Sequence, residues 1–172
     1  MPRLLVAPLS ALDDALANHR PSHLVSLLSP PHMIATPGGF DPVRHLKLGV
    51  NDVSDPNAGE HPPGREHIDR LIAFAREWDA SKPLLIHCWA GISRSMASAY
   101  TILCDRLGRD REFEIALAMR RRAPHASPNA LLVRHADDAL GRGGRMVAAL
   151  SVMGEPLNVA EGVTTDFPLA GL

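Results

Sequence analysis

The segment from residue 83 to residue 104 constrains the fold of this chain more than any other. Pro83–Ile86 is a short apolar run typical of a buried strand, and Met96–Cys104 has the composition of a helix. Between them, Cys88 is followed after five residues by Arg94. A loop from strand to helix offers inward backbone N–H groups and the positive end of the helix dipole. Because arginine adds a planar pair of donors for phosphate oxygens, the segment predicts a dianion site above a thiol.

The run His87-Cys88-Trp89-Ala90-Gly91-Ile92-Ser93-Arg94-Ser95 resembles the Cys-x5-Arg loop of the protein tyrosine phosphatase superfamily, and in its full form the dual-specificity branch. The resemblance implies that Cys88 is the nucleophile, Arg94 grips two phosphate oxygens and the Ser95 hydroxyl donates to the cysteine sulfur. It also implies that His87 orders the loop. The phosphate-binding residues are then Trp89, Ala90, Gly91, Ile92, Ser93 and Arg94. In this field we expect the thiol to be ionised at neutral pH.

A carboxylic acid should protonate the leaving oxygen and later act as the base toward water. Asp52 and Asp55 follow the predicted strand His45–Val50, so they should lie at the same sheet edge as Cys88. Asp52 is favoured because it comes just after the strand. The number of residues to Cys88 slightly favours Asp55, which is therefore the alternative acid. The alternative interpretation is that both are ordinary aspartates that form turns. The Pro-Asn pair at Asn129 matches a supporting residue of similar phosphatases, or it caps a helix.

Hydrophobic periodicity and turn residues predict the remaining elements. Strands are expected at residues 4–6, 23–28 and 45–50, and helices at 11–19, near 68–78, and at 110–121, 128–140 and 146–153. Ser10 and Ser127 are expected as helix N-caps. Alternating strands and helices predict an α/β fold with a mostly parallel central sheet flanked by helices. We expect a catalytic domain at 1–141 and an extension at 142–172, without chemistry of its own, that packs on it or is partly mobile.

Composition restricts the partners. The 172 residues are 45% hydrophobic and 22% charged with a net charge of −1, so nucleic acid and anionic membrane are not expected as generic partners. No run reaches the roughly 18 apolar residues of a membrane span. The first residues are too short an apolar run for a signal sequence. Cys88 and Cys104 are the two cysteines of the sequence, too few for a disulfide framework. Because an activated thiol needs a reducing compartment, we expect a cytoplasmic protein.

The loop sequence also indicates the substrate. It has no lysine that would meet additional phosphates, which favours a singly phosphorylated substrate, and Trp89 can pack on an aromatic leaving group. Phosphotyrosine is the first expectation and phosphoserine or phosphothreonine the second, on a protein or a small phosphomonoester. No phosphotyrosine-clamping segment precedes the loop, which leaves tyrosine exclusivity open. Phosphate, sulfate and vanadate should bind the loop.

Two other functions use a similar loop. One is a phosphate-binding pseudophosphatase, against which the retained Cys88, Arg94, Ser95 and an upstream aspartate argue. The other is rhodanese-like sulfur transfer or arsenate reduction, which needs no acid from a separate loop. No cofactor or metal is expected, because His61 and His67 with His87 lack a further ligand at a metal-like spacing.

Overall fold

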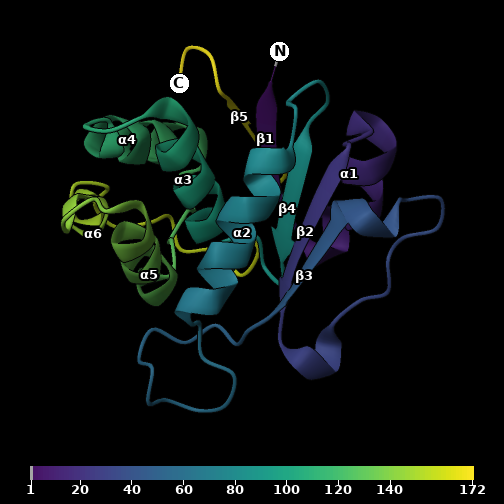
Figure 1. Cartoon of the computed structure of the whole chain (residues 1–172), viewed down its shortest axis with the longest axis horizontal. Coiled ribbons are helices and arrows are strands. Elements are labelled where there is room, and N and C mark those ends of the chain that lie inside the picture. Colours follow the sequence, from purple (N-terminus) through teal and green to yellow (C-terminus); the bar gives the residue numbers. More distant parts are fainter. Residues whose placement is uncertain (1) are drawn as a thin grey trace.

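The computed structural model describes residues 2–172 and contains a five-stranded sheet in the order β3-β2-β4-β1-β5 (Figure 1). The strands are β1 (Arg3–Pro8), β2 (His23–Leu28), β3 (His45–Gly49), β4 (Leu84–Cys88) and β5 (Thr165–Pro168). β1, β2, β3 and β4 pair in parallel, and β5 pairs antiparallel with β1 at the sheet edge. The α/β class and the mostly parallel sheet are confirmed.

The two faces of the sheet are covered unequally. α1 (Leu12–His19) packs on one face, where Leu5, Leu24 and Leu85 form a small core. The helices on the other face are α2 (Arg65–Glu77), α3 (Arg94–Leu107), α4 (Glu112–Arg122), α5 (Ala130–Leu140) and α6 (Arg145–Ser151). That larger core takes the alternate strand residues, Leu4 and Ile86 among them. The alternation is the period of two expected of strands buried on both faces.

The carboxyl ends of the parallel strands lie together at one end of the sheet, the lower end in Figure 1. Pro8 at the end of β1 pairs with Cys88 at the end of β4, and Leu28 at the end of β2 pairs with Gly49. The long loop 51–64 that follows β3 emerges at this end as well. Ligands of open α/β sheets bind outside such an end, which directs attention to the loop after Cys88.

Two predicted helix caps are wrong. A 3₁₀ turn at Leu9–Ala11 precedes α1, so Ser10 lies before the helix and its Oγ donates to Glu161 at 2.6 Å instead. Ser127 does not cap α5, because the helix begins only at Ala130; the Ser127 N–H donates to the Ile92 carbonyl. Asn129 is the N-cap, and its side-chain oxygen accepts from the Leu132 N–H at 3.0 Å.

The last residues contain a strand that the sequence pattern did not indicate. β5 has four residues, and Phe167 within it is fully buried against the larger core. A segment this short carries too little periodicity to identify it. Residues 142–172 thus contribute both α6 and an edge strand of the central sheet.

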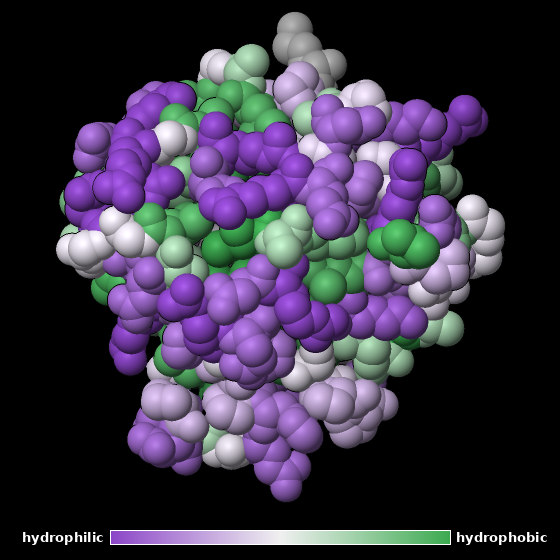
Figure 2. All heavy atoms as spheres, in the orientation of Figure 1, coloured by the Kyte–Doolittle hydropathy of each residue, from purple (hydrophilic) through white to green (hydrophobic). Residues whose placement is uncertain are grey.

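On the face seen in Figure 2, hydrophilic side chains dominate and hydrophobic atoms show between them across the middle. Among residues 2–172, none of the helices combines the length and the apolar composition needed to cross a membrane.

Candidate active site

Cys88 ends β4 and lies at the base of the loop it opens, here called the Cys88 loop (residues 88–94). Its side chain is buried, and its Sγ lies 3.0 Å from the Ser95 Oγ. Ser95 stands in the first turn of α3, which begins at Arg94 as the sequence predicts. The structure therefore brings the proposed nucleophile and the proposed hydroxyl donor into contact.

Gly91 allows the loop to pass close to the end of β1. Its φ is +69°, and a Cβ at this position would lie 2.7 Å from the backbone nitrogen of Pro8. Both the left-handed conformation and the close approach exclude a side chain.

Arg94 begins α3, and its side chain extends toward the end of β3. Its side chain is buried, and its Nη1 donates to the Val50 carbonyl at 2.8 Å. Its Nε is buried without a hydrogen-bond partner among residues 2–172. Arg94 also lines a cavity of about 190 Å³ together with Leu28, Ser29, His32 and Trp89. A buried guanidinium N–H without a protein acceptor is costly unless a ligand or a water molecule supplies one.

The two candidate acids have different surroundings. Asp52 lies against the Cys88 loop: its Oδ1 accepts from the Ser93 Oγ at 2.7 Å and from the Asn129 Nδ2 at 2.9 Å. Asp55 lies in a turn, where its Oδ1 accepts from the Asn57 N–H at 2.9 Å. The structure thus joins Asp52, Asn129 and the loop, and it leaves Asp55 in the turn-forming role.

Asn129 has two roles at once. Its side-chain oxygen caps α5, and its amide nitrogen donates to Asp52 and to the Val53 carbonyl. Its backbone N–H donates to the Ser93 carbonyl at 3.2 Å. Both interpretations of the Pro-Asn pair, as helix cap and as support of the site, therefore describe the same side chain.

His87 belongs to a buried polar row, defined here as Thr36, His45, Ser26 and His87. The Ser26 Oγ lies 2.6 Å from the His87 Nε2 and 2.8 Å from the His45 Nε2. The His45 Nδ1 lies 3.0 Å from the Thr36 Oγ1, and the His87 Nδ1 lies 3.4 Å from the Cys88 carbonyl oxygen. Burial lowers the pKa of both imidazoles to about 4.

Sequence reasoning missed Ser26 and His45. A signal was present, because Ser26 is a polar residue within the apolar run Leu24–Leu28. Its partner was not identifiable, since the pairing of Ser26 with His87 follows from the register of β2 against β4.

Two aromatic rings border the mouth of the cavity beside Arg94. Trp89 is 56% exposed, and its ring meets the His32 ring edge-on with centroids 5.7 Å apart. The sequence expectation gave Trp89 a place beside the substrate, whereas His32 was not identified. Its position on the turn after β2 becomes apparent only when β2 and β4 are paired.

Residues 155–162, here called the strap, support the loop from the outside. The Gly162 N–H donates to the Ala90 carbonyl at 2.8 Å, and the Leu157 N–H donates to the Pro124 carbonyl at 2.8 Å. A Cβ at Gly162 would lie 2.6 Å from the ring of His125, so the strap packs tightly here. The sequence gave no indication of this contact.

The remaining candidates have structural surroundings. The His67 Nδ1 accepts from the Gly64 N–H at the start of α2. Burial raises the pKa of the Cys104 thiol, in the core of α3, to about 12. Within residues 2–172 no three His, Cys, Asp or Glu side chains are grouped as a metal site would require.

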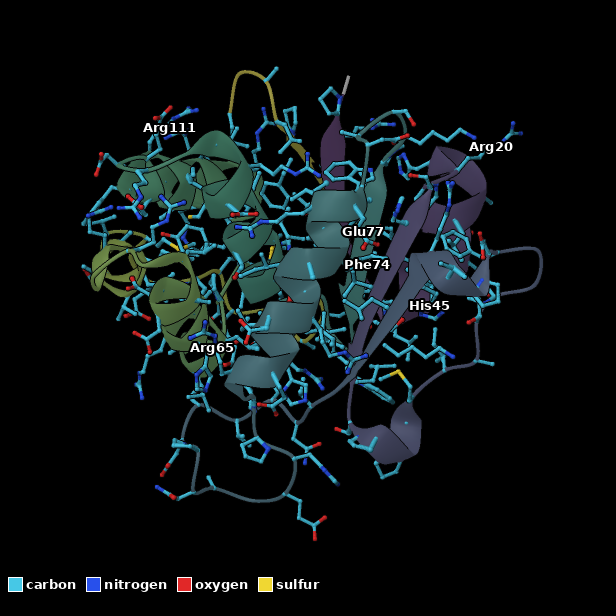
Figure 3. All side chains as sticks on the ribbon, viewed as in Figure 1. Arg20, His45, Arg65, Phe74, Glu77 and Arg111 are labelled. Atoms are coloured by element: carbon cyan, nitrogen blue, oxygen red, sulfur yellow. The ribbon has the colours of Figure 1, made fainter. Side chains whose placement is uncertain are left out.

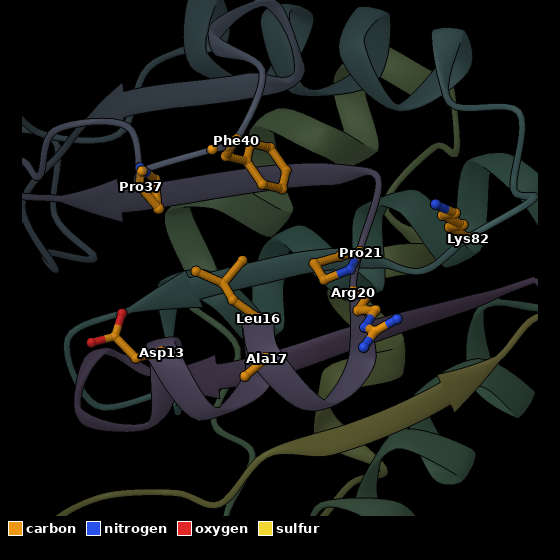
Figure 4. A pocket seen from close by; sticks show the side chains of 10 residues that line it. Asp13, Leu16, Ala17, Arg20, Pro21, Pro37, Phe40 and Lys82 are labelled. Atoms are coloured by element: carbon orange, nitrogen blue, oxygen red, sulfur yellow. The ribbon is translucent and has the colours of Figure 1, made fainter.

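A second cavity, of about 510 Å³, lies between α1 and the loop before β3 (Figure 4). Leu16, Pro37 and Phe40 supply apolar walls, with Asp13 toward one end and Arg20 and Lys82 toward the other. None of its lining residues belongs to the Cys88 loop.

Comparison with known proteins gives one short sequence match and several full-length structural matches. No family model matches the chain. A thiosulfate sulfurtransferase GlpE of Pseudomonas syringae pv. syringae is 42% identical over 55 residues, which are 30% of this chain and 52% of that protein. The chain therefore spans about half the length of this curated relative.

The solved structures resemble the chain over most of its length. DUSP15 matches with a TM-score of 0.59 and 16% identity, covering 89% of each chain. The human tyrosine phosphatase-like serine/threonine/tyrosine-interacting protein matches with a TM-score of 0.60 and 22% identity, over 82% of this chain and 93% of that one. PTPMT1, solved with PI(5)P, matches with a TM-score of 0.56 and 15% identity, over 81% and 94%. The chain thus has the fold of the dual-specificity branch of the protein tyrosine phosphatases.

Proposed function

We propose that the protein is a cysteine-dependent phosphomonoester hydrolase, a protein-tyrosine or dual-specificity phosphatase that acts through a cysteinyl-phosphate intermediate. The observation that carries this proposal is that the loop opened by the buried Cys88 ends at a buried Arg94 whose Nε has no protein acceptor among residues 2–172. A phosphate held above the sulfur supplies that acceptor. An active thiolate also suits a reducing compartment such as the cytoplasm.

In the first step the Cys88 thiolate attacks phosphorus in line with the leaving oxygen. The S–P bond forms as the P–O bond to the leaving group breaks, and Asp52 supplies a proton to that oxygen. Oδ1 of Asp52 is held by Ser93 and Asn129, so Oδ2 is the oxygen that can carry the proton. The inward N–H groups and the guanidinium neutralise the phosphoryl charge, which removes the need for a metal ion.

In the second step water attacks phosphorus and the S–P bond breaks. The Asp52 carboxylate accepts a proton from the water, which restores the acid for the next cycle. The Ser95 hydroxyl, 3.0 Å from the sulfur, donates to the departing thiolate and makes it a better leaving group.

The mouth of the site favours an aryl phosphate. The exposed Trp89 ring and the His32 ring flank the cavity beside Arg94, where they can pack on an aromatic leaving group. PTPMT1 was solved with a phosphoinositide, yet the loop of this chain has no lysine for further phosphates. We therefore place phosphotyrosine first and phosphoserine or phosphothreonine second.

Hydrolysis of p-nitrophenyl phosphate without added metal tests the proposal. We expect turnover that vanadate inhibits and that Cys88→Ser abolishes, with a trapped phosphoenzyme at Cys88 after rapid acid quench. Cys104→Ala is the matched control, because this second thiol lies in the core away from the loop. Undiminished turnover in Cys88→Ser would refute the mechanism.

Sulfur transfer is the second candidate, and the match to GlpE is the observation that favours it. It requires Cys88 to take a sulfur atom from thiosulfate as a persulfide, with release of sulfite, and to pass it to cyanide. That route gives no role to Asp52 or to the Ser95 hydroxyl. Thiocyanate formation from thiosulfate and cyanide, measured beside phosphate release, decides between the two.

A further inference from the structure

We propose that Thr36, His45 and Ser26 are positioning residues that fix which nitrogen of His87 carries its proton, and that they thereby hold the Cys88 carbonyl in place beneath the loop. The inference deepens the proposed phosphatase function and rests on it for its consequence in catalysis. Its basis is the geometry of the buried polar row, which contacts the Cys88 carbonyl through His87 and ends at Thr36 in the loop before β3.

The direction of every hydrogen bond in the row follows from its inner end. A backbone carbonyl has no proton, so the Nδ1 of His87 must donate to the Cys88 oxygen. The neutral ring then has an acceptor at Nε2, which receives the Ser26 hydroxyl proton at 2.6 Å. With its proton used, the Ser26 oxygen accepts from the His45 Nε2–H at 2.8 Å.

The same reasoning fixes the outer end. Since the neutral His45 ring carries its proton on Nε2, its Nδ1 is an acceptor and receives the Thr36 hydroxyl at 3.0 Å. One arrangement of protons thus provides a donor and an acceptor for each of the four hydrogen bonds of the row. The arrangement requires neutral rings, and burial, together with the nearby charges of Lys47 at His45 and Arg94 at His87, disfavours protonation of either ring.

The Cys88 carbonyl matters because of the peptide bond it belongs to. No cis peptide occurs among the described residues, so the Trp89 N–H points opposite to the Cys88 C=O. A His87 that donates to this oxygen therefore also sets the direction of the first N–H of the loop. With the other tautomer, Nδ1 would face the carbonyl as a second acceptor and the peptide would lose its anchor.

The outer end of the row is held by the loop that precedes β3. His45, labelled in Figure 3, begins strand β3 at the edge of the sheet. The Phe40 and His45 rings pack nearly perpendicular to each other, with their centroids 6.5 Å apart. Thr36 is partly exposed, whereas Ser26 and His87 are fully buried. Changes at Thr36 therefore reach the row from the surface without altering the core.

Nitrogen NMR of the histidine rings tests the proton order directly. In the full-length protein near neutral pH we expect His87 as the Nδ1–H tautomer and His45 as the Nε2–H tautomer. Ser26→Ala should leave His87 in a mixture of tautomers, because its Nε2 loses the donor. A wild-type His87 found as the Nε2–H tautomer overturns the inference, whether or not the protein hydrolyses phosphate.

Alkylation of Cys88 by iodoacetamide provides a second readout that needs no turnover. In a Cys104→Ala background, Ser26→Ala should slow alkylation near neutral pH by about tenfold and Thr36→Val by a few-fold, the range of one lost hydrogen bond. Thr36→Ser keeps the hydroxyl and should restore the rate. Ser22→Ala is the matched control, because it removes another serine–imidazole contact, to His23, at the opposite end of β2.

The outcomes separate the inference from the proposed function. Equal alkylation rates in folded Ser26→Ala, Thr36→Val and wild-type protein overturn the positioning role. A fixed Nδ1–H tautomer with slowed alkylation in the variants supports it, even if p-nitrophenyl phosphate is not hydrolysed and the phosphatase proposal fails. In an active enzyme, the same variants should lower kcat more than they change KM.

Discussion

At the scale of single residues, hydrogen-bond partners distinguish the two candidate acids of the site. Asp52 is bonded to the Cys88 loop through Ser93, whereas Asp55 accepts from the Asn57 N–H within its own turn. This difference separates two carboxylates that stand three residues apart in the same loop. The role of each can therefore be tested by the same substitution.

Asp52→Asn should lower kcat for aryl phosphate hydrolysis by roughly 10²–10⁴-fold, the usual contribution of a general acid. Asp55→Asn should stay close to wild type, because its oxygen still accepts from the Asn57 N–H. Steady-state kinetics of the two variants on p-nitrophenyl phosphate measures the difference. The reverse pattern would assign the acid to Asp55.

Gly91→Ala should abolish turnover and destabilise the fold. Its Cβ would press on the Pro8 backbone at 2.7 Å in a left-handed conformation, which an alanine adopts only at a cost of about 1–2 kcal/mol even without the contact. Urea unfolding and phosphate release measure the two effects. Gly59→Ala is the control, because it also has a positive φ but nothing within 4 Å of its Cβ.

At this scale the sequence predicted best the residues of the short run that carries the Cys-x5-Arg spacing. The resemblance of residues 87–95 to a known loop predicted the contact between the Cys88 sulfur and the Ser95 hydroxyl at the start of α3. Ser26 and His45 were not predictable, because their contact with His87 depends on which strands pair and in which register. Register of parallel strands is set by the whole core, which no local pattern encodes.

At the scale of elements, α5 and the strap both press on the Cys88 loop from outside. The Asn129 side chain joins the start of α5 to Asp52, and Gly162 joins the strap to Ala90. Each contact brings together segments that lie far apart in sequence. The predicted start of α5 at Pro128 was wrong, because Asn129 caps the helix while its N–H donates to the Ser93 carbonyl of the loop.

Two substitutions at Asn129 separate its roles. Asn129→Asp keeps an N-cap acceptor but loses the donor to Asp52 and adds a like charge beside it, so kcat should fall with little loss of stability. Asn129→Ala should also cost about 1 kcal/mol of stability through the lost cap. Urea unfolding and steady-state kinetics report the two effects. Equal loss of stability in both variants would argue against the cap.

Gly162→Ala should displace the strap and cost roughly 1–3 kcal/mol, because the new Cβ overlaps the His125 ring. The double variant Gly162→Ala with His125→Ala should recover part of this loss by removing the ring. A double-mutant cycle of unfolding free energies measures the coupling. Simple additivity of the two losses would show that the contact is not tight.

At the scale of the whole molecule, the fold class followed from alternation of strands and helices, while the asymmetry of the layers did not. Six predicted helices carry no information about which face of the sheet they cover; the topology places only α1 on one face. β5 and the strap also escaped prediction, because each is short and stabilised by distant partners. Truncation after residue 141 tests the proposed domain limit.

The buried histidines predict how the stability of the whole protein depends on pH. His45 and His87 have folded pKa values of about 4, below the unfolded value of 6.5, so only the unfolded state takes up their protons between these values. Stability should therefore decline as pH falls from about 6.5 toward 4, by up to about 1.4 kcal/mol per unit for each ring. Urea unfolding across this range measures the slope, and His87→Asn should flatten it. A slope unaffected by this substitution would contradict the assignment.

The contact between Gly162 and Ala90 has a consequence for synthesis on the ribosome. The Cys88 loop leaves the exit tunnel roughly seventy residues before the glycine that bonds to it. During that interval the loop lacks its outer support, and its sulfur is more open to oxidants than in the finished molecule. Translation speed over the last part of the coding sequence thus sets how long the Cys88 thiol of a nascent chain stays without this cover.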